Sequence, residues 1–309
     1  AMKALGVPGR CRVFEIPTGI KYITAPPRMS LYLRKSAEIF SIYLRFVSPD
    51  DIHVYSVDEC FIDITGYKLL YKKSDSEFAK MLMDAVYEQT GICATAGIGS
   101  NLFLAKVALD IISKHSPDRM GVLDEESFRK KIWHHRPITD IWNIGKGTAK
   151  RLEKFGVYDL CGVAHMPEEL LYRTFGTNAE YLIDHANGVE SCTISEIKAY
   201  KPINTSISNS QIMFRDYGYG ECRVILREMV ECRVLGLIKK RKVCGSISLT
   251  VGYSKNIIPP YCRTLKLKKA TNSYREIYSA FASLYEESKC NTAPIRRLAV
   301  SLGNLMDEE

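Results

Sequence analysis

The segment that most constrains the fold is residues 52–65, IHVYSVDECFIDIT, in which two β-prone runs flank an acidic pair. Runs rich in Ile, Val, Tyr and Phe favour strands. Because neighbouring strand residues point to opposite faces, Asp58 and Glu59 can share one site only if the chain turns there. The segment therefore predicts a β-hairpin at the edge of a sheet. Its carboxylates suit Mg²⁺, which prefers oxygen ligands and would relieve their repulsion; an acidic turn in solvent is the alternative.

The composition is that of a globular protein with room for two or three domains, with 309 residues of which 46% are hydrophobic. No apolar run approaches the roughly 20 residues of a membrane span and no signal peptide is recognisable, so we expect no membrane association. The ten cysteines form no C-x-x-C pair and no Cys/His group with zinc spacing. This pattern predicts a reducing compartment, the cytoplasm. Ala1 before Met2 resembles an expression scar.

Positive charge is concentrated in the last third of the chain. The net charge is +8, and residues 203–309 hold 17 Lys and Arg against 10 Asp and Glu, a net of +7. A local basic surplus predicts a polyanionic partner, most often nucleic acid. A basic surface without a partner is the alternative.

Hydrophobic periodicity predicts an α+β multidomain fold, with a layered α/β sheet as the alternative for its first domain. Helices at 31–46, 76–89 and 102–113 and a strand at 92–98 predict a layered sheet domain, residues 115–190 look all-helical, and 191–202 reads as a linker. The last third predicts strand-helix-strand-strand-helix-strand, with strands at 243–253, 263–269 and 298–302 and helices at 221–239 and 273–287. One sheet face would carry small hydroxyls and cations that suit a phosphate backbone, namely Ser246, Ser248, Lys266, Lys268 and Arg297.

Two glycine-containing segments predict phosphate contacts. In GIGSNLFLAK (residues 97–106) a strand leads into a helix start followed by a lysine, although an ion pair of Lys106 with Asp110 is the alternative. In ITDIWNIGKGTAKRL (residues 138–152) two glycines precede a helix start among basic residues. This pattern predicts a helix-hairpin-helix that contacts the DNA backbone, with an ordinary turn as the alternative; its contact residues would be Gly145, Lys146, Gly147, Thr148 and Lys150.

Taken together, YSVDECFIDITG, GIGSNLFLAKVALD, NIGKGTAKRLEKFGV and SISNSQ resemble, in order and over essentially the whole chain, a Y-family translesion DNA polymerase. The resemblance is to the UmuC-type branch of Gram-positive bacteria. It implies a remnant of the fingers at 1–24, an incomplete palm at 25–114, a helical helix-hairpin-helix thumb at 115–190, a linker at 191–202 and a βαββαβ little finger at 203–309. The implied function is DNA-templated nucleotidyl transfer in translesion synthesis, DNA repair and the SOS response.

The resemblance also assigns roles to residues and partners. Asp58 and Glu59 would be catalytic carboxylates and two of three Mg²⁺ ligands, with Lys106 and Lys3 on the triphosphate. Primer–template DNA and deoxynucleoside triphosphates would be the partners. A sliding clamp or SOS accessory proteins would bind through segments outside this sequence.

One departure from the family pattern bears on activity. Family members begin with a strand that carries the first metal-binding Asp, whereas this sequence starts at residues that resemble the late fingers. We therefore expect this chain to be catalytically impaired. A non-catalytic DNA-binding remnant is the alternative. A nucleotide cyclase-like palm is disfavoured by residues 138–152 and by the basic last third.

Overall fold

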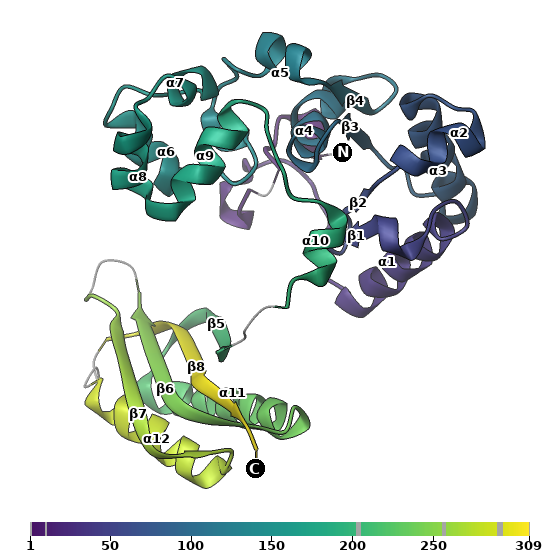
Figure 1. Cartoon of the computed structure of the whole chain (residues 1–309). Coiled ribbons are helices and arrows are strands. Elements are labelled where there is room, and N and C mark those ends of the chain that lie inside the picture. Colours follow the sequence, from purple (N-terminus) through teal and green to yellow (C-terminus); the bar gives the residue numbers. More distant parts are fainter. Residues whose placement is uncertain (1, 10, 202–204, 255–257, 289–292, 309) are drawn as a thin grey trace. The chain divides into compact units, whose positions relative to one another are not determined.

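The computed structural model describes all residues except 1, 10, 202–204, 255–257, 289–292 and 309, and at Lys3 it describes the backbone alone. The chain divides into two compact units, Ala1–Tyr200 and Lys201–Glu309 (Figure 1). Each unit has a hydrophobic core of its own. Among the described residues, no helix combines the length and the apolar character that crossing a membrane requires.

The first part of the first unit mixes helices with short strands, as the sequence predicts. In chain order its elements are α1 (Met29–Tyr43), β1 (Ile52–Val54), β2 (Cys60–Ile62), α2 (Lys68–Tyr71), α3 (Asp75–Thr90), β3 (Ala96–Gly99), α4 (Leu102–Val107) and β4 (Met120–Leu123). Strands β1 and β2 pair antiparallel and form the predicted hairpin. Strands β3 and β4 pair in parallel as a second two-stranded sheet.

Strand β4 corrects the expectation that residues 115–190 are all helical. Met120–Leu123 lies in register with Ala96–Gly99 of β3. Four residues are too few to show a periodic pattern, and the strand exists because β3 supplies its hydrogen-bond partners. The expected strand at 92–98 is correspondingly shorter, since only its last part has a partner.

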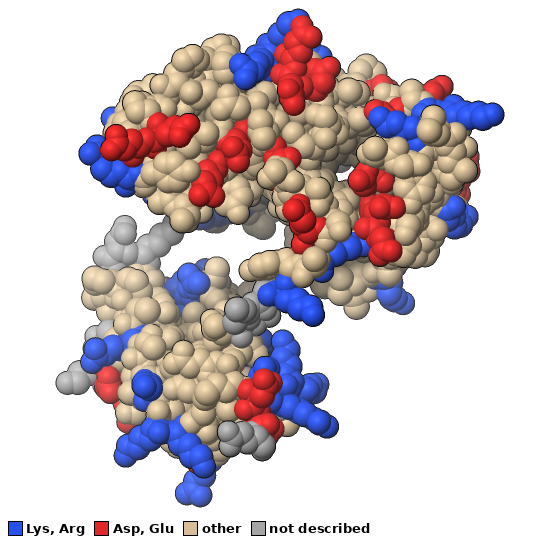
Figure 2. All heavy atoms as spheres, viewed as in Figure 1, with Lys and Arg blue, Asp and Glu red and all other residues tan. Residues whose placement is uncertain are grey.

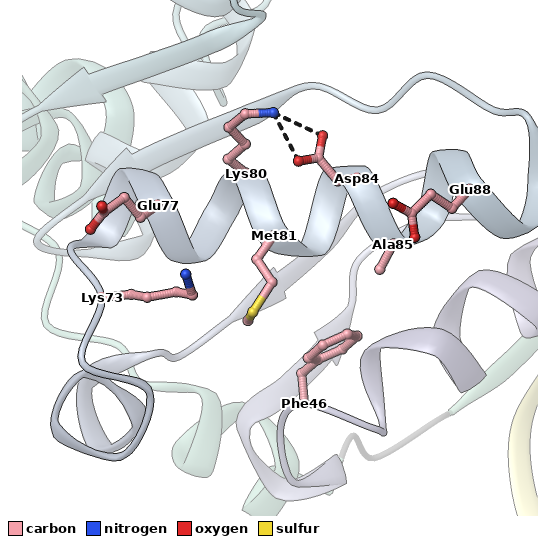
Figure 3. Close-up of a pocket in the computed structure, with 8 residues that line it drawn as sticks. All are labelled: Phe46, Lys73, Glu77, Lys80, Met81, Asp84, Ala85 and Glu88. Atoms are coloured by element: carbon pink, nitrogen blue, oxygen red, sulfur yellow. Dashed lines mark hydrogen bonds and ion pairs between the residues drawn. The ribbon is translucent and has the colours of Figure 1, made fainter.

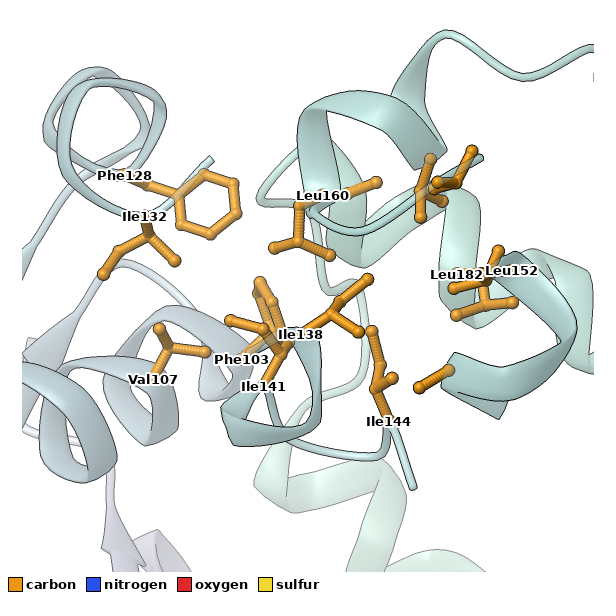
Figure 4. Close-up of a cluster of buried hydrophobic side chains, with 14 of the residues drawn as sticks. Phe103, Val107, Phe128, Ile132, Ile138, Ile141, Ile144, Leu152, Leu160 and Leu182 are labelled. Carbon is orange, nitrogen blue, oxygen red and sulfur yellow. The ribbon is translucent and has the colours of Figure 1, made fainter. Parts of the chain in front are cut away.

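The rest of the first unit is helical, with α5 (Glu125–Lys131), α6 (Lys146–Glu153), α7 (Leu160–Ala164), α8 (Glu168–Phe175), α9 (Ala179–Ala186) and α10 (Ile194–Ala199). Helices α5 to α9 share one core with α4. Figure 4 shows Phe103 and Val107 of α4 facing Phe128, Ile132 and Ile138, and all five side chains are buried. This shared core fixes α4, and with it Lys106, against the helical part of the unit.

The predicted linker, residues 191–202, contains helix α10. Thr193 caps the helix in a capping box with Glu196, and Ile194 is buried. Lys198 donates to the carbonyl of Pro49, which ties α10 to the segment before β1. The helix is only 6 residues long, so its periodicity is too short to detect from sequence.

The second unit has the predicted strand-helix-strand-strand-helix-strand order. Its elements are β5 (Ser206–Tyr217), α11 (Tyr219–Lys239), β6 (Lys242–Tyr253), β7 (Tyr261–Thr271), α12 (Tyr274–Glu287) and β8 (Ile295–Asp307). The four strands form one antiparallel sheet in the order β5-β8-β6-β7. Helices α11 and α12 cover one face of this sheet (Figure 1). The other face is called the open face below.

Candidate functional site

The acidic pair lies in a tight turn between β1 and β2. The backbone N–H groups of Tyr55 and Ser56 both donate to the carbonyl of Glu59 at 3.0 Å, which closes the turn. Asp58 is exposed, and its carboxylate accepts a hydrogen bond of 2.8 Å from the hydroxyl of Ser56. The turn therefore holds the Asp58 carboxylate against Ser56, whereas the Glu59 carboxylate has a different partner.

Lys106 of α4 is the partner of Glu59. Its ammonium lies 2.7 Å from a carboxylate oxygen of Glu59 and 3.1 Å from one of Asp110, and its side chain is 7% exposed. Burial alone would lower the pKa of this ammonium, but its hydrogen bonds to Glu59 and Asp110 outweigh burial and raise the pKa. The ion pair with Asp110, the alternative to phosphate binding, is thus present, together with a contact to Glu59 that sequence spacing does not reveal.

Glycines and a helix cap place Lys106 beside the turn. The side chain of Asn101 accepts from the N–H of Leu104 at 2.8 Å and starts α4. A Cβ at Gly97 of β3 would lie 2.2 Å from the carbonyl oxygen of Ala105, so α4 packs directly on the strand backbone. The predicted strand-to-helix segment therefore serves close packing, which holds the lysine in its buried position.

Tyr55 and Trp142 were not predicted as site residues. The indole N–H of Trp142 donates to the hydroxyl of Tyr55 at 3.0 Å. The ammonium of Lys106 lies 5.7 Å from the centroid of the Tyr55 ring, within cation–π range. These contacts join the 55–59 turn to residues 138–152. The signal for them in the sequence is weak: each aromatic residue lies within one of the motifs, but 87 positions separate the two.

The described residues contain no group of three or more His, Cys, Asp and Glu side chains that could hold a metal ion. Asp58 and Glu59 have the oxygen ligands that Mg²⁺ prefers, but they supply two carboxylates rather than three. They fit a Mg²⁺ ion that takes its remaining ligands from water, phosphate or a further carboxylate. The side chain of Lys3, the other predicted triphosphate contact, lies outside the described part.

Residues 138–152 form a turn followed by an open helix start. A 3₁₀ turn at Ile138–Asp140, rather than a full first helix, precedes α6. Gly145 precedes α6 without a side-chain cap, and no acidic residue lies in the first turn. Gly145, Lys146, Gly147 and Lys150 are exposed and Thr148 is half-buried. Free N–H groups at a helix start bind anions, so this turn suits phosphate.

The open face of the second unit carries the predicted hydroxyls and cations. Directly paired antiparallel residues share a face, and the register pairs Ser246 with Lys266, and Ser248 with Thr264 and Ser301. Arg297 is paired with Gly252 on the same face. Lys268 is exposed two residues beyond Lys266, next to an irregularity in the register. Figure 2 shows Lys and Arg spread over the visible side of this unit.

A cavity of about 430 Å³ lies along α3 in the first unit, and the residues of the 55–59 turn and Lys106 do not line it. Figure 3 shows Met81 and Phe46 beneath it and the ion pair of Lys80 with Asp84, 2.8 Å, at its rim. It contains none of the predicted site residues, and its charged groups largely neutralise one another. It is therefore separate from the candidate site.

Comparisons with known proteins bear on the family and the fold of the chain. A model of the impB/mucB/samB family matches residues 1–110, and a model of that family's C-terminal domain matches residues 204–309. The chain is 31% identical over 311 residues to the putative UV-damage repair protein UvrX of Bacillus subtilis, covering 99% of this chain and 72% of the relative. DNA polymerase IV 2 of the same organism is 28% identical, with 99% and 74% covered.

The solved structure of a Y-family DNA polymerase chimera of Dbh and Dpo4 matches the fold with a TM-score of 0.69 at 20% identity, over 93% of this chain and 79% of that one. Fold and relatives together define the class of DNA-directed DNA polymerases. The chain belongs to the Y family of these polymerases, whose functions are translesion synthesis and DNA repair. The family prediction from the sequence is confirmed.

Proposed function

We propose that this chain takes part in DNA-templated nucleotidyl transfer and that the 55–59 turn is part of the active site. The observation that carries the proposal is the buried Lys106 ammonium 2.7 Å from Glu59. The contact supports a fixed cation against Glu59, whose chain neighbour Asp58 is a second, exposed carboxylate. A site that binds a metal ion and a triphosphate together needs this combination of charges.

We infer that the metal is Mg²⁺ and that Asp58 and Glu59 would hold it. When bound, Mg²⁺ would activate the primer hydroxyl and offset the charge on the leaving pyrophosphate. Lys106 would then orient the triphosphate as a positive point charge, and its raised pKa keeps it protonated at neutral pH. The role of Lys3 on the triphosphate stays a prediction from the family resemblance.

We further propose that a polypeptide of these 309 residues is a poor catalyst by itself. Among the described residues no third carboxylate joins Asp58 and Glu59, and a site for two metal ions would need further protein ligands to keep the reacting groups in place. We expect little or no primer extension from this polypeptide, and extension from a longer version that adds a segment with a third carboxylate. In the longer version, Asp58→Ala or Glu59→Ala should abolish extension.

The control is a preparation of the Asp58→Ala, Glu59→Ala polypeptide purified in the same way. Equal extension by the 309-residue and longer versions would contradict the impairment. Extension that survives Asp58→Ala in the longer version would contradict the active-site assignment itself.

We propose that DNA is held by the start of α6 and by the open face of the second unit. The support is the uncapped helix start next to Lys146 and the small hydroxyl groups beside Lys266. Phosphate contacts of this kind give slight sequence preference and steep salt dependence.

Changing Lys266 and Lys268 together to Ala should lower the slope of log affinity against log salt by about 1 to 2, near 0.9 per lost phosphate contact. Fluorescence anisotropy on duplex DNA at several salt concentrations measures this slope. The matched control changes Lys80 and Lys130, exposed lysines of the first unit that make surface ion pairs, and should leave the slope near its original value. If the Lys266, Lys268 variant had the same slope as the Lys80, Lys130 control, with the fold intact by circular dichroism, the open face would not be the DNA-binding surface.

The alternative function is DNA binding without catalysis, which would show as retained DNA affinity and no extension even in the longer version. Primer–template DNA and deoxynucleoside triphosphates are the partners that we propose. A sliding clamp, SOS accessory proteins and a cytoplasmic location remain predictions from the sequence.

A further inference from the structure

An exposed aromatic side chain stands on the open face of the second unit. Phe214 of β5 is 95% exposed and Ile212 is 70% exposed, whereas Met213 between them is buried in the core at 2%. The burial of Met213 turns its neighbours Ile212 and Phe214 away from the core, toward the open face. Phe214 lies where the register of β5 with β8 shifts, between Ile212 and Tyr217. Both side chains leave a large apolar area in water, and neither belongs to the core that the described residues of the unit form.

The cation nearest in the register lies beside Ile212, two residues before Phe214 in β5. Arg297 pairs with Ile212 in the register, and its Nε donates to the hydroxyl of Ser210 at 2.9 Å. Arg297 also faces Gly252, where a Cβ would lie 3.2 Å from the Cβ of Arg297. The glycine thus leaves room for the arginine side chain to lie across the sheet. Ser210, Ile212, Phe214 and Arg297 are called the Phe214 patch below.

The acidic groups near the patch already have cationic partners. Glu221 binds Arg215 at 2.5 Å, and Asp216 lies 3.6 Å from Arg296. Among the described residues, no acidic side chain forms an ion pair with Arg297. The patch therefore combines a flat aromatic ring with a cation that has no carboxylate partner in the described part of the chain.

We propose that the Phe214 patch binds an unpaired base of single-stranded DNA, with the base stacked on the Phe214 ring and the adjoining phosphate near Arg297. Aromatic rings next to cations are the common means of binding single strands, because every base offers a π face while the cation meets the backbone. A base inside a duplex is already stacked and is not available to the ring. The inference rests on the proposal that DNA lies on the open face, and it adds selectivity for unpaired nucleotides.

The test uses the full chain with Phe214→Leu, which keeps an apolar side chain but loses the ring, and Phe214→Trp, which keeps a ring. Binding is measured to a single-stranded oligonucleotide and to a blunt duplex. We expect Phe214→Leu to weaken single-strand binding about tenfold, with duplex binding and the salt slope unchanged, because stacking releases no counterions. Phe214→Trp should bind like the original chain. Leu69→Ala, which shortens an apolar side chain that is 91% exposed in the first unit, is the control.

A second readout places the fluorescent base 2-aminopurine in the single strand, where stacking on the ring quenches its emission. We expect quenching with the original chain and with Phe214→Trp but not with Phe214→Leu. Unchanged single-strand affinity and quenching in Phe214→Leu would overturn the inference and leave a protein partner as the occupant of the patch. The Lys266, Lys268 double variant separates the two proposals: if it lowers the slope while Phe214→Leu has no effect, DNA lies on the open face and only the stacking role fails.

Discussion

At the scale of single residues, Lys106 is the most constrained charged group of the candidate site. Its ammonium is shared between Glu59 of the hairpin and Asp110 one helical turn further along. A buried ammonium that loses a partner keeps its desolvation cost without the compensating interaction. Asp110 therefore has a structural role even if only Glu59 binds metal.

We predict that Asp110→Asn lowers the free energy of unfolding by about 1–3 kcal/mol, less than the full loss of a buried pair because Glu59 remains. The matched control is Asp84→Asn. Asp84 also lies four residues after its lysine, Lys80, but both side chains are more than half exposed, so the change should be below about 1 kcal/mol. Urea unfolding followed by tryptophan fluorescence measures both, and similar losses in the two variants would contradict the role given to burial.

Residue types and local motifs could be predicted from the sequence at this scale, but their long-range partners could not. Asp58, Glu59, Lys106 and the 145–148 turn stand out because charge, glycine and spacing coincide locally. The contact of Lys106 with Glu59 and that of Tyr55 with Trp142 depend on how distant segments pack. Nothing in the spacing of those residues encodes that packing.

At the scale of elements, the position of α4 depends on strand residues without side chains. A Cβ at Gly97 would meet the backbone of Ala105 and Leu109 at 2.2 and 2.3 Å, and one at Gly121 would meet Ala108 at 2.4 Å. Such distances require the helix to move away from the sheet. Because the helix carries Lys106, this packing links the fold to the charge arrangement at the hairpin.

We predict that Gly97→Ala destabilises the first unit by about 2–4 kcal/mol, at or above the range for overpacked cores, because backbone rather than a flexible side chain blocks the new methyl group. Gly236→Ala is the opposite case. Gly236 lies inside α11 with nothing within 4 Å of the added Cβ, so the change should stabilise the helix by about 1 kcal/mol. Thermal unfolding by circular dichroism gives both signs, and a neutral Gly97→Ala would show that α4 has room to shift.

Element length decides what the sequence could predict. The four strands of the second unit run for 11 to 13 residues. Alternation predicted nearly all of β6, most of β7 and the middle of β8, whereas β5 was indicated only by the resemblance of SISNSQ. Strands β3 and β4 have 4 residues each and α10 has 6, so tertiary pairing rather than local pattern defines them.

At the scale of the whole molecule, buried thiols make stability sensitive to alkaline pH. Burial raises the pKa of the Cys222 thiol, and likewise that of Cys244, from 9.0 to about 11. As pH rises, the unfolded chain therefore loses these protons before the folded chain does. The contribution of the two protonated thiols to the free energy of unfolding is fully present below about pH 9, and it is lost progressively as the pH rises toward 11.

We predict that the free energy of unfolding of the second unit falls between pH 9 and pH 11 and that a Cys222→Ala, Cys244→Ala variant, though less stable overall, shows a smaller fall. Urea titrations across that range measure the effect. The exposed Cys232 and Cys262 provide the control, since changing them to Ala should leave the pH dependence as it was. An equal fall in both variants would show that other groups, such as tyrosines, govern the alkaline transition.

The strand order of the second unit has a consequence for circular permutation and for genetic exchange of the unit. Strand β8 lies beside β5, and Ser206 at the entrance of the unit pairs with Gly303 close to its exit. The first and last residues of the unit are therefore neighbours at one end of the sheet. A short peptide could join them and allow new ends to be opened in another loop. For the same reason, recombination could exchange the whole unit between related chains without changing the path of the chain through either hydrophobic core.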